Sequence, residues 1–317
     1  MLRILLLTLV ALGTTVPAVA QVDLSGTWAT RNHEDWMERW PGPDVGDFTG
    51  LPINEDALAR ALAYSPSQLA LPERQCLYYG PTYTAIGPFG LRIWAESEPV
   101  DGLVVSWHMS GAVDKTPRTI WMDGRPHPSP NAVKTFEGFS TGVWEGDALV
   151  VTTTHMKAGP LRRNGVPHSD QVVMTEYISR YDDKLTVMTH LDDPIYMDEP
   201  HVISRTYQED PSMNLRVYPQ PCVPGIEAPG LAADEVPHYL PGENPFEGEM
   251  SSRYGLPLDA VHGGAETLYP DYRQFLEELY NRPAECGRYC CGWDGGNTGN
   301  DGSTRNGLAC INREPAR

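Results

Sequence analysis

The stretch QVVMTEYISRYDDKLTVMTHL, residues 171–191, decides the fold class. In each half, β-branched and other apolar residues alternate with polar ones, the period-two pattern of a strand with one buried face. The step Tyr181-Asp182-Asp183 between the halves is typical of a tight turn. We therefore predict two antiparallel strands, Gln171–Arg180 and Leu185–Leu191, joined as a hairpin.

Similar strand signals recur on both sides of this hairpin. Each is rich in β-branched or aromatic residues and is bounded by Gly, Pro, Asn or Asp. The further predicted strands are Val22–Ala29, Leu91–Glu96, Leu103–Met109, Arg118–Asp123, Ala148–Met156 and Val202–Tyr207. Short strands joined by tight turns predict an all-β fold, an antiparallel lipocalin-like barrel or a sandwich. Two short helical segments are also expected, Asn54–Leu71 and Tyr269–Tyr280.

Composition limits the classes of function. The chain has 317 residues, 24 basic and 42 acidic side chains, and a formal net charge of −18. Such an acidic chain argues against nucleic acid or an anionic membrane surface as the main partner. The 30 glycines and 29 prolines suit a turn-rich β protein better than a helical bundle. After the N-terminus no stretch is long and apolar enough for a transmembrane span, so stable membrane insertion is not expected.

The N-terminus has the three-part layout of a secretory signal. One basic residue, Arg3, precedes the apolar run Ile4–Leu12, and Ala18-Val19-Ala20 is a small-residue cleavage site. We expect cleavage near Ala20 and export, to the periplasm or the extracellular medium. The expected organisation is a signal peptide over 1–20, a β-barrel body over 21–207, a Pro-rich strap over 208–268, and a helix plus Cys-rich tail over 269–317.

An even cysteine count in an exported chain predicts disulfides. The simplest pairing joins Cys76 with Cys222 in the main body. Two bridges are expected in the C-terminal tail, where three pairings are possible among Cys286, Cys290, Cys291 and Cys310. Adjacent Cys290 and Cys291 should take different partners, because a bridge between neighbours strains the peptide. Zinc is the alternative, but the spacing C-x3-C-C-x18-C is not a standard zinc pattern, so we expect no metal.

Three motifs in the body are distinctive: Asp123-Gly-Arg-Pro-His127, Trp144-Glu-Gly-Asp-Ala-Leu-Val-Val151 and Leu161-Arg-Arg-Asn-Gly-Val-Pro167. Together they resemble a family of exported bacterial all-β, lipocalin- or calycin-like proteins with W-E-G-D-x-L-V-V and L-R-(K/R)-N-G-V-P patterns. The resemblance covers roughly Leu24 to Tyr207. The family has no established activity, so the resemblance implies no catalytic residues. His155 and His168 stand where family members show Asn and Tyr, which makes both candidates for a property of this chain.

Strand parity indicates which ionisable side chains face the core, because alternate residues share a face. On this parity Glu176, His155, Arg118 and Arg205 each lie among apolar neighbours. An ionisable group on a core face is costly unless paired, and such groups cluster in functional sites. Two interpretations stay open. Glu176 forms a structural bridge with Arg118 or Arg205, or these side chains line a ligand cavity.

Histidines add candidates for the same cavity. His108, His155 and His190 lie near strand ends, where the mouth of a barrel would be. A histidine beside a carboxylate acts as a general acid or base near neutral pH. We therefore predict His155, Glu176 and His108 as catalytic residues. The predicted binding residues are Arg118, Arg205, Trp121, His190 and His168.

The segment Gly138-Phe-Ser-Thr-Gly142 matches the G-x-S-x-G pattern of a serine nucleophile. That pattern has its meaning on a strand, a sharp turn and a helix. Here Trp144-Glu-Gly-Asp147 and a strand follow instead. We interpret the segment as a glycine-flanked loop.

The sequence supports three functions. The first is an exported enzyme that acts on a small organic substrate in a barrel cavity by cofactor-independent acid–base chemistry, as a lyase, isomerase or hydrolase. The second is a non-catalytic lipocalin-like protein that binds a small-molecule ligand in the same cavity. The third is an envelope protein–protein interaction module, which would have a filled barrel and an exposed apolar patch.

Overall fold

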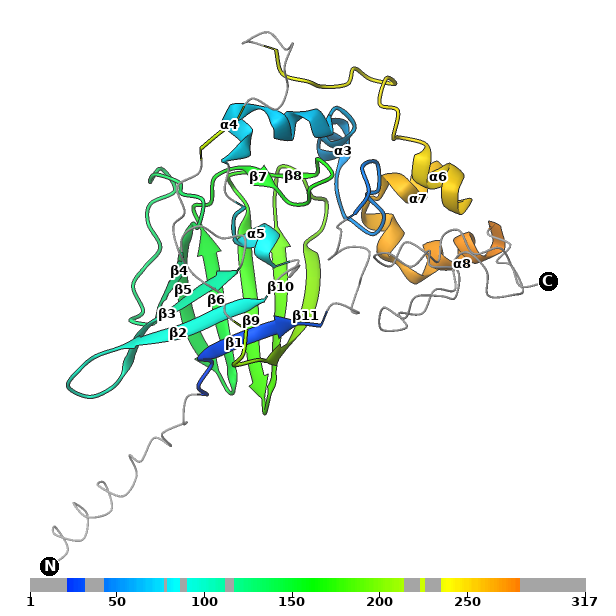
Figure 1. The fold of residues 1–317 in the computed structure, drawn as a ribbon. Helices are drawn as coiled ribbons and strands as arrows, with labels where there is room; N and C mark the ends of the chain where they lie inside the picture. The colour runs from blue at the N-terminus through cyan, green and yellow to red at the C-terminus, as the bar shows by residue number, and fades with distance from the viewer. Residues whose placement is uncertain are drawn as a thin grey trace, which may run out of the picture.

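The computed structural model describes residues 22–31, 43–76, 79–85, 90–111, 117–213, 223–225 and 235–279. Over these ranges the chain forms a closed barrel, with short helices at one end and along one side (Figure 1). The predicted all-β fold with few helices is confirmed. Of the two predicted alternatives, a barrel and a sandwich, the closed ring of strands is a barrel. The expected signal peptide and Cys-rich tail lie outside the described residues.

Nine strands close the ring in the order β1-β11-β10-β9-β6-β5-β4-β3-β2, and β1 pairs with both β11 and β2. Their bounds are β1 Gly26–Thr30, β2 Leu91–Ser97, β3 Val104–Gly111, β4 Arg118–Trp121, β5 Phe139–Glu145, β6 Ala148–Thr154, β9 Val173–Tyr181, β10 Lys184–Asp192 and β11 His201–Glu209. A separate pair, β7 Gly159–Pro160 and β8 Pro167–His168, lies in the connection from β6 to β9.

Strand direction follows from the odd number of strands. Nine strands cannot alternate in direction all the way round a closed ring, so one neighbouring pair has to be parallel. That pair is β4 and β5, and the other eight pairs of the ring are antiparallel. A parallel pair needs a crossover connection from one end of the barrel to the other. Residues 122–138 supply it, and we call them the crossover.

β5 corrects the interpretation of Gly138-Phe-Ser-Thr-Gly142 as a loop. Ser140 lies within β5, opposite Thr153 of β6, and the two hydroxyl oxygens are 2.8 Å apart. A Cβ added at Gly142 would come within 2.8 Å of Met122 Sδ and 3.0 Å of Ile120 Cγ2. The glycine therefore serves close packing inside the barrel, although glycine in a sequence normally weakens a strand prediction.

The two ends of the barrel are built differently. One end, here called the turn end, has the short β5–β6 and β9–β10 turns at residues 145–148 and 181–184. The other, the cap end, has the long β6–β9 and β10–β11 connections and carries the helix α3, Glu55–Leu62 (Figure 1). Asn54 caps α3 as predicted, since its side chain accepts a hydrogen bond from the Ala57 amide.

Two apolar clusters follow this division. The first lies inside the barrel and includes Trp28, Leu91, Ile93, Trp107, Met109, Ile120, Leu149, Val151, Ile178, Leu185, Val187 and Tyr207. The second joins α3 to the cap end and includes Phe48, Leu51, Ile53, Ala57, Ala61, Met156, Leu161, Val166, Met174 and Leu191. Burial of these side chains is the main driving force for closing the barrel and seating the helix.

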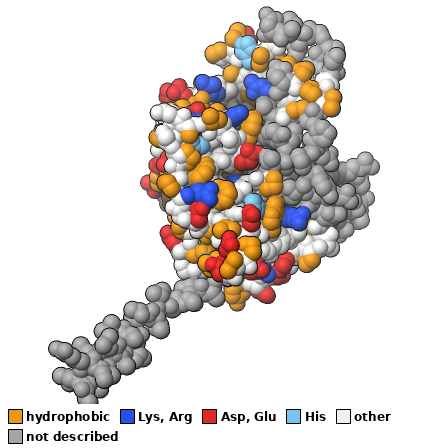
Figure 2. Space-filling model, turned by 90° about the vertical axis from the view of Figure 1, so that its left-hand side faces the viewer, with side chains coloured by type: hydrophobic (Ala, Val, Ile, Leu, Met, Phe, Trp, Pro, Cys, Tyr) orange, Lys and Arg blue, Asp and Glu red, His pale blue; other side chains and the backbone are white. Residues whose placement is uncertain are grey.

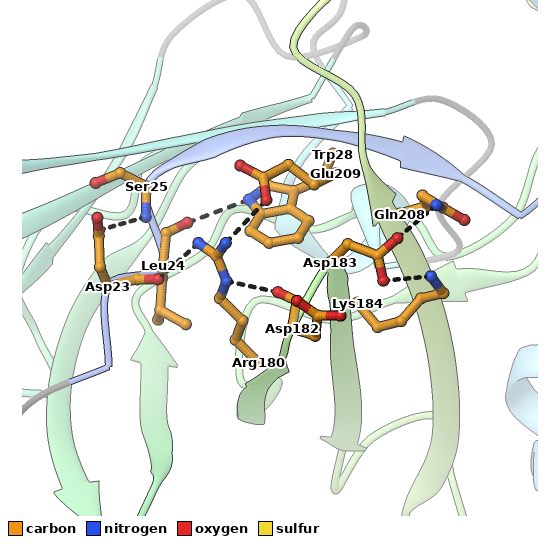
Figure 3. A network of polar contacts seen from close by, with 10 residues as sticks. All are labelled: Asp23, Leu24, Ser25, Trp28, Arg180, Asp182, Asp183, Lys184, Gln208 and Glu209. Atoms are coloured by element: carbon orange, nitrogen blue, oxygen red, sulfur yellow. Dashed lines mark hydrogen bonds and ion pairs between the residues drawn. The ribbon is translucent and has the colours of Figure 1, made fainter.

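The turn end is closed by one aromatic side chain and one arginine (Figure 3). Trp28 of β1 is fully buried, and its indole Nε1 donates to the Leu24 carbonyl at 3.1 Å. The Arg180 guanidinium lies 5.0 Å from the centroid of the Trp28 ring. It also donates to the Glu209 carboxylate at 2.8 Å and to the Asp23 carbonyl at 3.0 Å. Indole and guanidinium thus both have hydrogen-bond partners at the closed end of the barrel.

Shorter helices complete the described chain. Before the barrel are η1 Pro66–Ala70, α4 Pro72–Gln75 and α5 Pro81–Thr84, and after it are α6 Glu249–Tyr254, α7 Leu258–His262, η2 Ala265–Leu268 and α8 Pro270–Leu279. The described part of the predicted Pro-rich strap contains the short helices α6 and α7. Among the helices described, none is both long and apolar enough to cross a membrane.

One cysteine falls within the described residues. Cys76 takes part in a disulfide. The other candidates, Cys222, Cys286, Cys290, Cys291 and Cys310, lie outside the described residues. The pairing of Cys76 with Cys222 and the bridges of the tail therefore stay predictions.

Candidate functional site

Seven buried polar side chains line six neighbouring strands near the cap end, and we call them the polar arc. Its members are Arg118 of β4, Ser140 of β5, Thr153 of β6, Glu176 of β9, Thr189 of β10, and His201 and Arg205 of β11. The ladder registers align them: Ser140 is opposite Thr153, and Thr189 is opposite Glu176. They alternate along their strands with outward-facing residues, as strand geometry requires.

An ion pair crosses the barrel inside the arc. Arg118 Nη1 is 2.5 Å from Glu176 Oε2, and the two side chains are only 6% and 4% exposed. Because β5 and β6 stand between β4 and β9 in the ring, this contact has to pass through the interior. Arg118 also donates to Thr153 Oγ1 at 3.2 Å and approaches Met109 Sδ at 3.1 Å. Arg118, one of the two candidate partners predicted for Glu176, is thus its ion-pair partner in the structure.

The β11 end of the arc is positively charged. His201 and Arg205 lie on the same inner face of β11, with Ile203 between them, and are 6% and 3% exposed. Burial, with smaller contributions from the positive charges of Arg162 and Arg205, lowers the pKa of His201 to about 3. Arg162 comes from the β7–β8 connection and is itself buried. The His201 imidazole is therefore neutral at ordinary pH and lies in a positive field.

Two atoms of the arc have unmet hydrogen-bonding capacity. Among the described residues, Thr189 Oγ1 and His201 Nε2 are buried and have no hydrogen-bond partner. The large majority of buried side-chain polar atoms in proteins do have one. Leaving such an atom without a partner costs about 1–3 kcal/mol. These two atoms therefore offer hydrogen bonds to a water or a ligand.

Apolar side chains face the arc from the other side of the ring. Strands β2 and β3 contribute Leu91, Ile93, Trp107 and Met109 to the barrel core, and we call these four residues the apolar wall. Trp107 is 2% exposed, and its indole Nε1 also has no hydrogen-bond partner among the described residues. Met109 is opposite Arg118 of the arc in the β3–β4 ladder, so charged, hydroxyl-bearing and apolar side chains meet in the interior, a combination common in sites for small organic molecules.

His155 does not join the arc. Strand β6 ends at Thr154, so parity no longer applies at His155, whose backbone is left-handed with φ of 58°. Its Nδ1 lies 2.6 Å from Thr154 Oγ1 and its Nε2 lies 2.9 Å from the Ser129 carbonyl oxygen. The expectation that His155 shares the inner face of Val151 therefore fails at the strand end.

Hydrogen bonds around His155 define a chain that fastens the crossover. The Ser129 carbonyl only accepts, so His155 Nε2 donates to it, and in the neutral ring Nδ1 accepts from the Thr154 hydroxyl. Thr154 then accepts from His127 Nδ1 at 2.7 Å, and His127 Nε2 accepts from Thr141 at 2.8 Å. Burial lowers the pKa of His127, with a further contribution from His155, which favours this neutral arrangement.

His108 lies on the outer face of β3, because its neighbours Trp107 and Met109 face the core. Its Nε2 is 3.4 Å from Glu96 Oε2, and its Nδ1 is 3.2 Å from Thr119 Oγ1. Its ring stacks on Trp94 with 5.2 Å between centroids. The three predicted catalytic residues, His155, Glu176 and His108, thus lie in three separate surroundings. The distances show no single acid–base site formed by them.

Three predicted binding residues also lie outside the arc. Trp121 is on the outer face of β4, where the Arg125 guanidinium lies 3.7 Å from its ring centroid. His190 is on the outer face of β10, with its ring centroid 5.7 Å from that of Tyr177. His168 is buried in β8, with its Nδ1 3.0 Å from the Ser169 carbonyl, and burial lowers its pKa.

The structure thus brings together three of the predicted site residues, Arg118, Glu176 and Arg205. Sequence reasoning did not single out His201, Thr189 and Thr153, and it set Ser140 aside as part of a loop. His201 has the parity of Ile203 and Arg205, but the predicted strand began one residue late, at Val202. Within the described residues, no cluster of three or more His, Cys, Asp or Glu side chains is arranged to hold a metal ion.

Comparison with known proteins gives no match: no protein-family model, curated protein or solved structure is similar to this chain. The resemblance to an exported lipocalin-like family therefore stays a prediction. Function has to be argued from the geometry of the polar arc.

Proposed function

We propose that this protein binds a small organic molecule inside the barrel, at the polar arc. One observation carries the proposal: Thr189 Oγ1 and His201 Nε2, on neighbouring strands and both buried, have no hydrogen-bond partner among the described residues. They lie on the same inner face as a buried ion pair and opposite an apolar wall. A ligand with polar and apolar parts would satisfy both sides of this interior.

The geometry favours binding over acid–base turnover. The Glu176 carboxylate is engaged by Arg118 at 2.5 Å, which suits an orienting group better than a proton carrier. The depressed pKa of His201, about 3, makes its imidazole a weak base near neutral pH. His155 and His108 have hydrogen-bond partners elsewhere. Cofactor-independent catalysis in this barrel is therefore the second candidate function, and the experiment below distinguishes it.

An interaction module receives less support from the surface. On the face shown in Figure 2, hydrophobic side chains of the described residues are interspersed with acidic and basic ones. A docking surface for a stable partner is expected to show a contiguous apolar patch. The buried polar arc would also have no role in such a module.

The test is incubation of the purified full-length protein with a small-molecule extract of the cells that produce it, followed by native mass spectrometry. We expect one retained species per chain, released on denaturation. Thr189→Val should abolish retention without harming the fold, because it replaces an unpartnered buried hydroxyl with a methyl group.

Thr186→Val is the matched control, since Thr186 lies on the outer face of the same strand, β10. Equal retention by Thr189→Val and Thr186→Val would contradict the proposed site, and no retained species would contradict binding itself. If an extract component is converted in amounts far beyond protein stoichiometry, and Thr189→Val loses this conversion, the protein is an enzyme and not a carrier.

A further inference from the structure

The chemistry of the bound molecule can be narrowed from the β10–β11 part of the arc. Thr189 is opposite Ile203 and His201 is opposite Leu191, so Thr189 and His201 occupy diagonal positions on one inner face. Diagonal neighbours in an antiparallel pair are about 7–8 Å apart at the backbone and remain within reach of one group between their side chains. Two atoms of a single small group can therefore hydrogen-bond to Thr189 Oγ1 and His201 Nε2.

Both side chains are suited to donate to that group. The Thr189 hydroxyl rotates freely to donate its proton. A neutral imidazole carries one N–H, and in the Nε2–H tautomer His201 donates from the atom that has no partner. When both act as donors on one face, they complement an acceptor group. A carboxylate has two oxygens, and when ionised it only accepts.

The charged residues near Thr189 and His201 favour an anionic group on the ligand. Arg205 is on the same inner face of β11 as His201, and Arg162 approaches from the cap. Both charges act on His201 in the same direction, toward the neutral imidazole, so each makes a positive contribution to the field there. In a buried site an anion gains from such a field and from charge-assisted hydrogen bonds, whereas a cation would be repelled.

We infer that the molecule bound at the polar arc is a small organic monocarboxylate. Its carboxylate lies between Thr189, His201 and Arg205, and its apolar part lies against Met109 and Trp107 of the apolar wall. This inference rests on the proposed function, and it adds the charge of the ligand and the direction in which it lies.

Matched pairs of compounds test the charge of the head group at constant shape. The probes are benzoate against benzamide and hexanoate against hexanamide, with benzylammonium and inorganic phosphate as further probes, measured by isothermal titration calorimetry on the full chain. We expect at least one carboxylate to bind at least tenfold more tightly than its amide. Benzylammonium and phosphate should give no heat, because one is cationic and the other has no apolar part.

Two variants locate the binding. Thr189→Val and His201→Phe should each weaken carboxylate binding at least tenfold, while Thr186→Val should bind as the wild type does. Circular dichroism with a thermal melt shows whether each variant is folded, and Thr189→Val is the decisive one because it keeps the side-chain volume.

Other outcomes overturn the inference. These are amides that bind as tightly as the acids, phosphate that binds alone, carboxylate binding that survives Thr189→Val, or no binding of any probe. If the cell extract yields a retained neutral species, the inference is wrong while the proposed function stands. If neither extract nor probes bind, both are wrong, so the two failures are distinguishable.

Discussion

The turn end and the cap end of the same barrel use an arginine–glutamate pair in opposite ways. At the turn end, Arg180 and Glu209 are 2.8 Å apart with side chains 23% and 29% exposed, and the arginine covers the buried ring of Trp28. At the cap end, Arg118 and Glu176 are almost fully buried. A pair at the rim stays partly hydrated and costs little, whereas a buried pair must recover a large desolvation penalty.

The difference teaches where stability and function lie. The turn end could be sealed by apolar burial and by charges that remain near water. The cap end keeps charges, hydroxyls and an imidazole where apolar residues would pack at lower cost, and two of its polar atoms lack protein partners among the described residues. Proteins place such costly features at functional sites. We therefore propose that the turn end mainly stabilises the barrel and that the cap end binds the ligand.

The largest expected effect is at the turn end. Trp28→Ala should lower the free energy of unfolding by about 3–5 kcal/mol, the usual cost of removing a buried aromatic side chain. Trp28 is fully buried in the barrel core, and Arg180 would lose its contact. Urea titration followed by circular dichroism measures the change. A loss below about 1 kcal/mol would contradict the role of Trp28 as the plug of the barrel.

The next effect concerns the buried pair of the cap end. Glu176→Gln should destabilise by about 3 kcal/mol, because the Arg118 charge is left buried without its counter-charge. Replacing both residues, as Arg118→Met with Glu176→Met, should recover most of that loss, since no buried charge then remains. The same urea titrations apply. A double variant less stable than Glu176→Gln would show that the pair stabilises the fold.

A third prediction concerns pH. The pKa of His201 is about 3 in the folded protein, below the ordinary value of 6.5, so between these values only the unfolded chain binds a proton at this site. Stability supplied by neutral His201 is thus complete above pH 6.5 and decreases as the pH falls toward 3. His201→Gln should reduce the slope of unfolding free energy against pH there by about 1.4 kcal/mol per pH unit.

Urea titrations at several pH values measure that slope. Val202→Gln, an exposed position of the same strand, is the control for introducing a glutamine and should keep the wild-type slope. Equal slopes for His201→Gln and the wild type would mean that the imidazole titrates normally in the fold.

The smallest effect is expected at His155. Asparagine adopts left-handed backbone more readily than most residues, so His155→Asn keeps the local conformation and loses only the ring contacts. We expect a change in unfolding free energy of about 1 kcal/mol or less and unchanged ligand retention. Loss of ligand retention in a folded His155→Asn variant would show that His155 does contribute to the ligand site.

Strand interiors were predictable from the sequence, whereas strand ends and the choice between candidate long-range partners were not. Alternation placed Glu176, Arg118 and Arg205 on core faces, and Asn54 was correctly identified as a helix cap. Parity failed at His155, because the chain leaves β6 one residue earlier. β5 was missed because Gly142 weakens the strand pattern, while the close packing that requires this glycine comes from residues outside β5. The sequence offered Arg118 and Arg205 as partners of Glu176. Only the ring order shows that the Arg118–Glu176 contact crosses the barrel interior.

A crystal structure of the protein purified from its producing cells, at a resolution that shows ordered water, tests the central claim most directly. We predict continuous density between Thr189 Oγ1 and His201 Nε2 that has two oxygens near these atoms and extends toward Trp107. A single water that bridges Thr189 and His201, with the apolar wall packed directly against the arc, would satisfy both polar atoms without a ligand. That result would contradict the account and leave the polar arc a structural feature of the barrel.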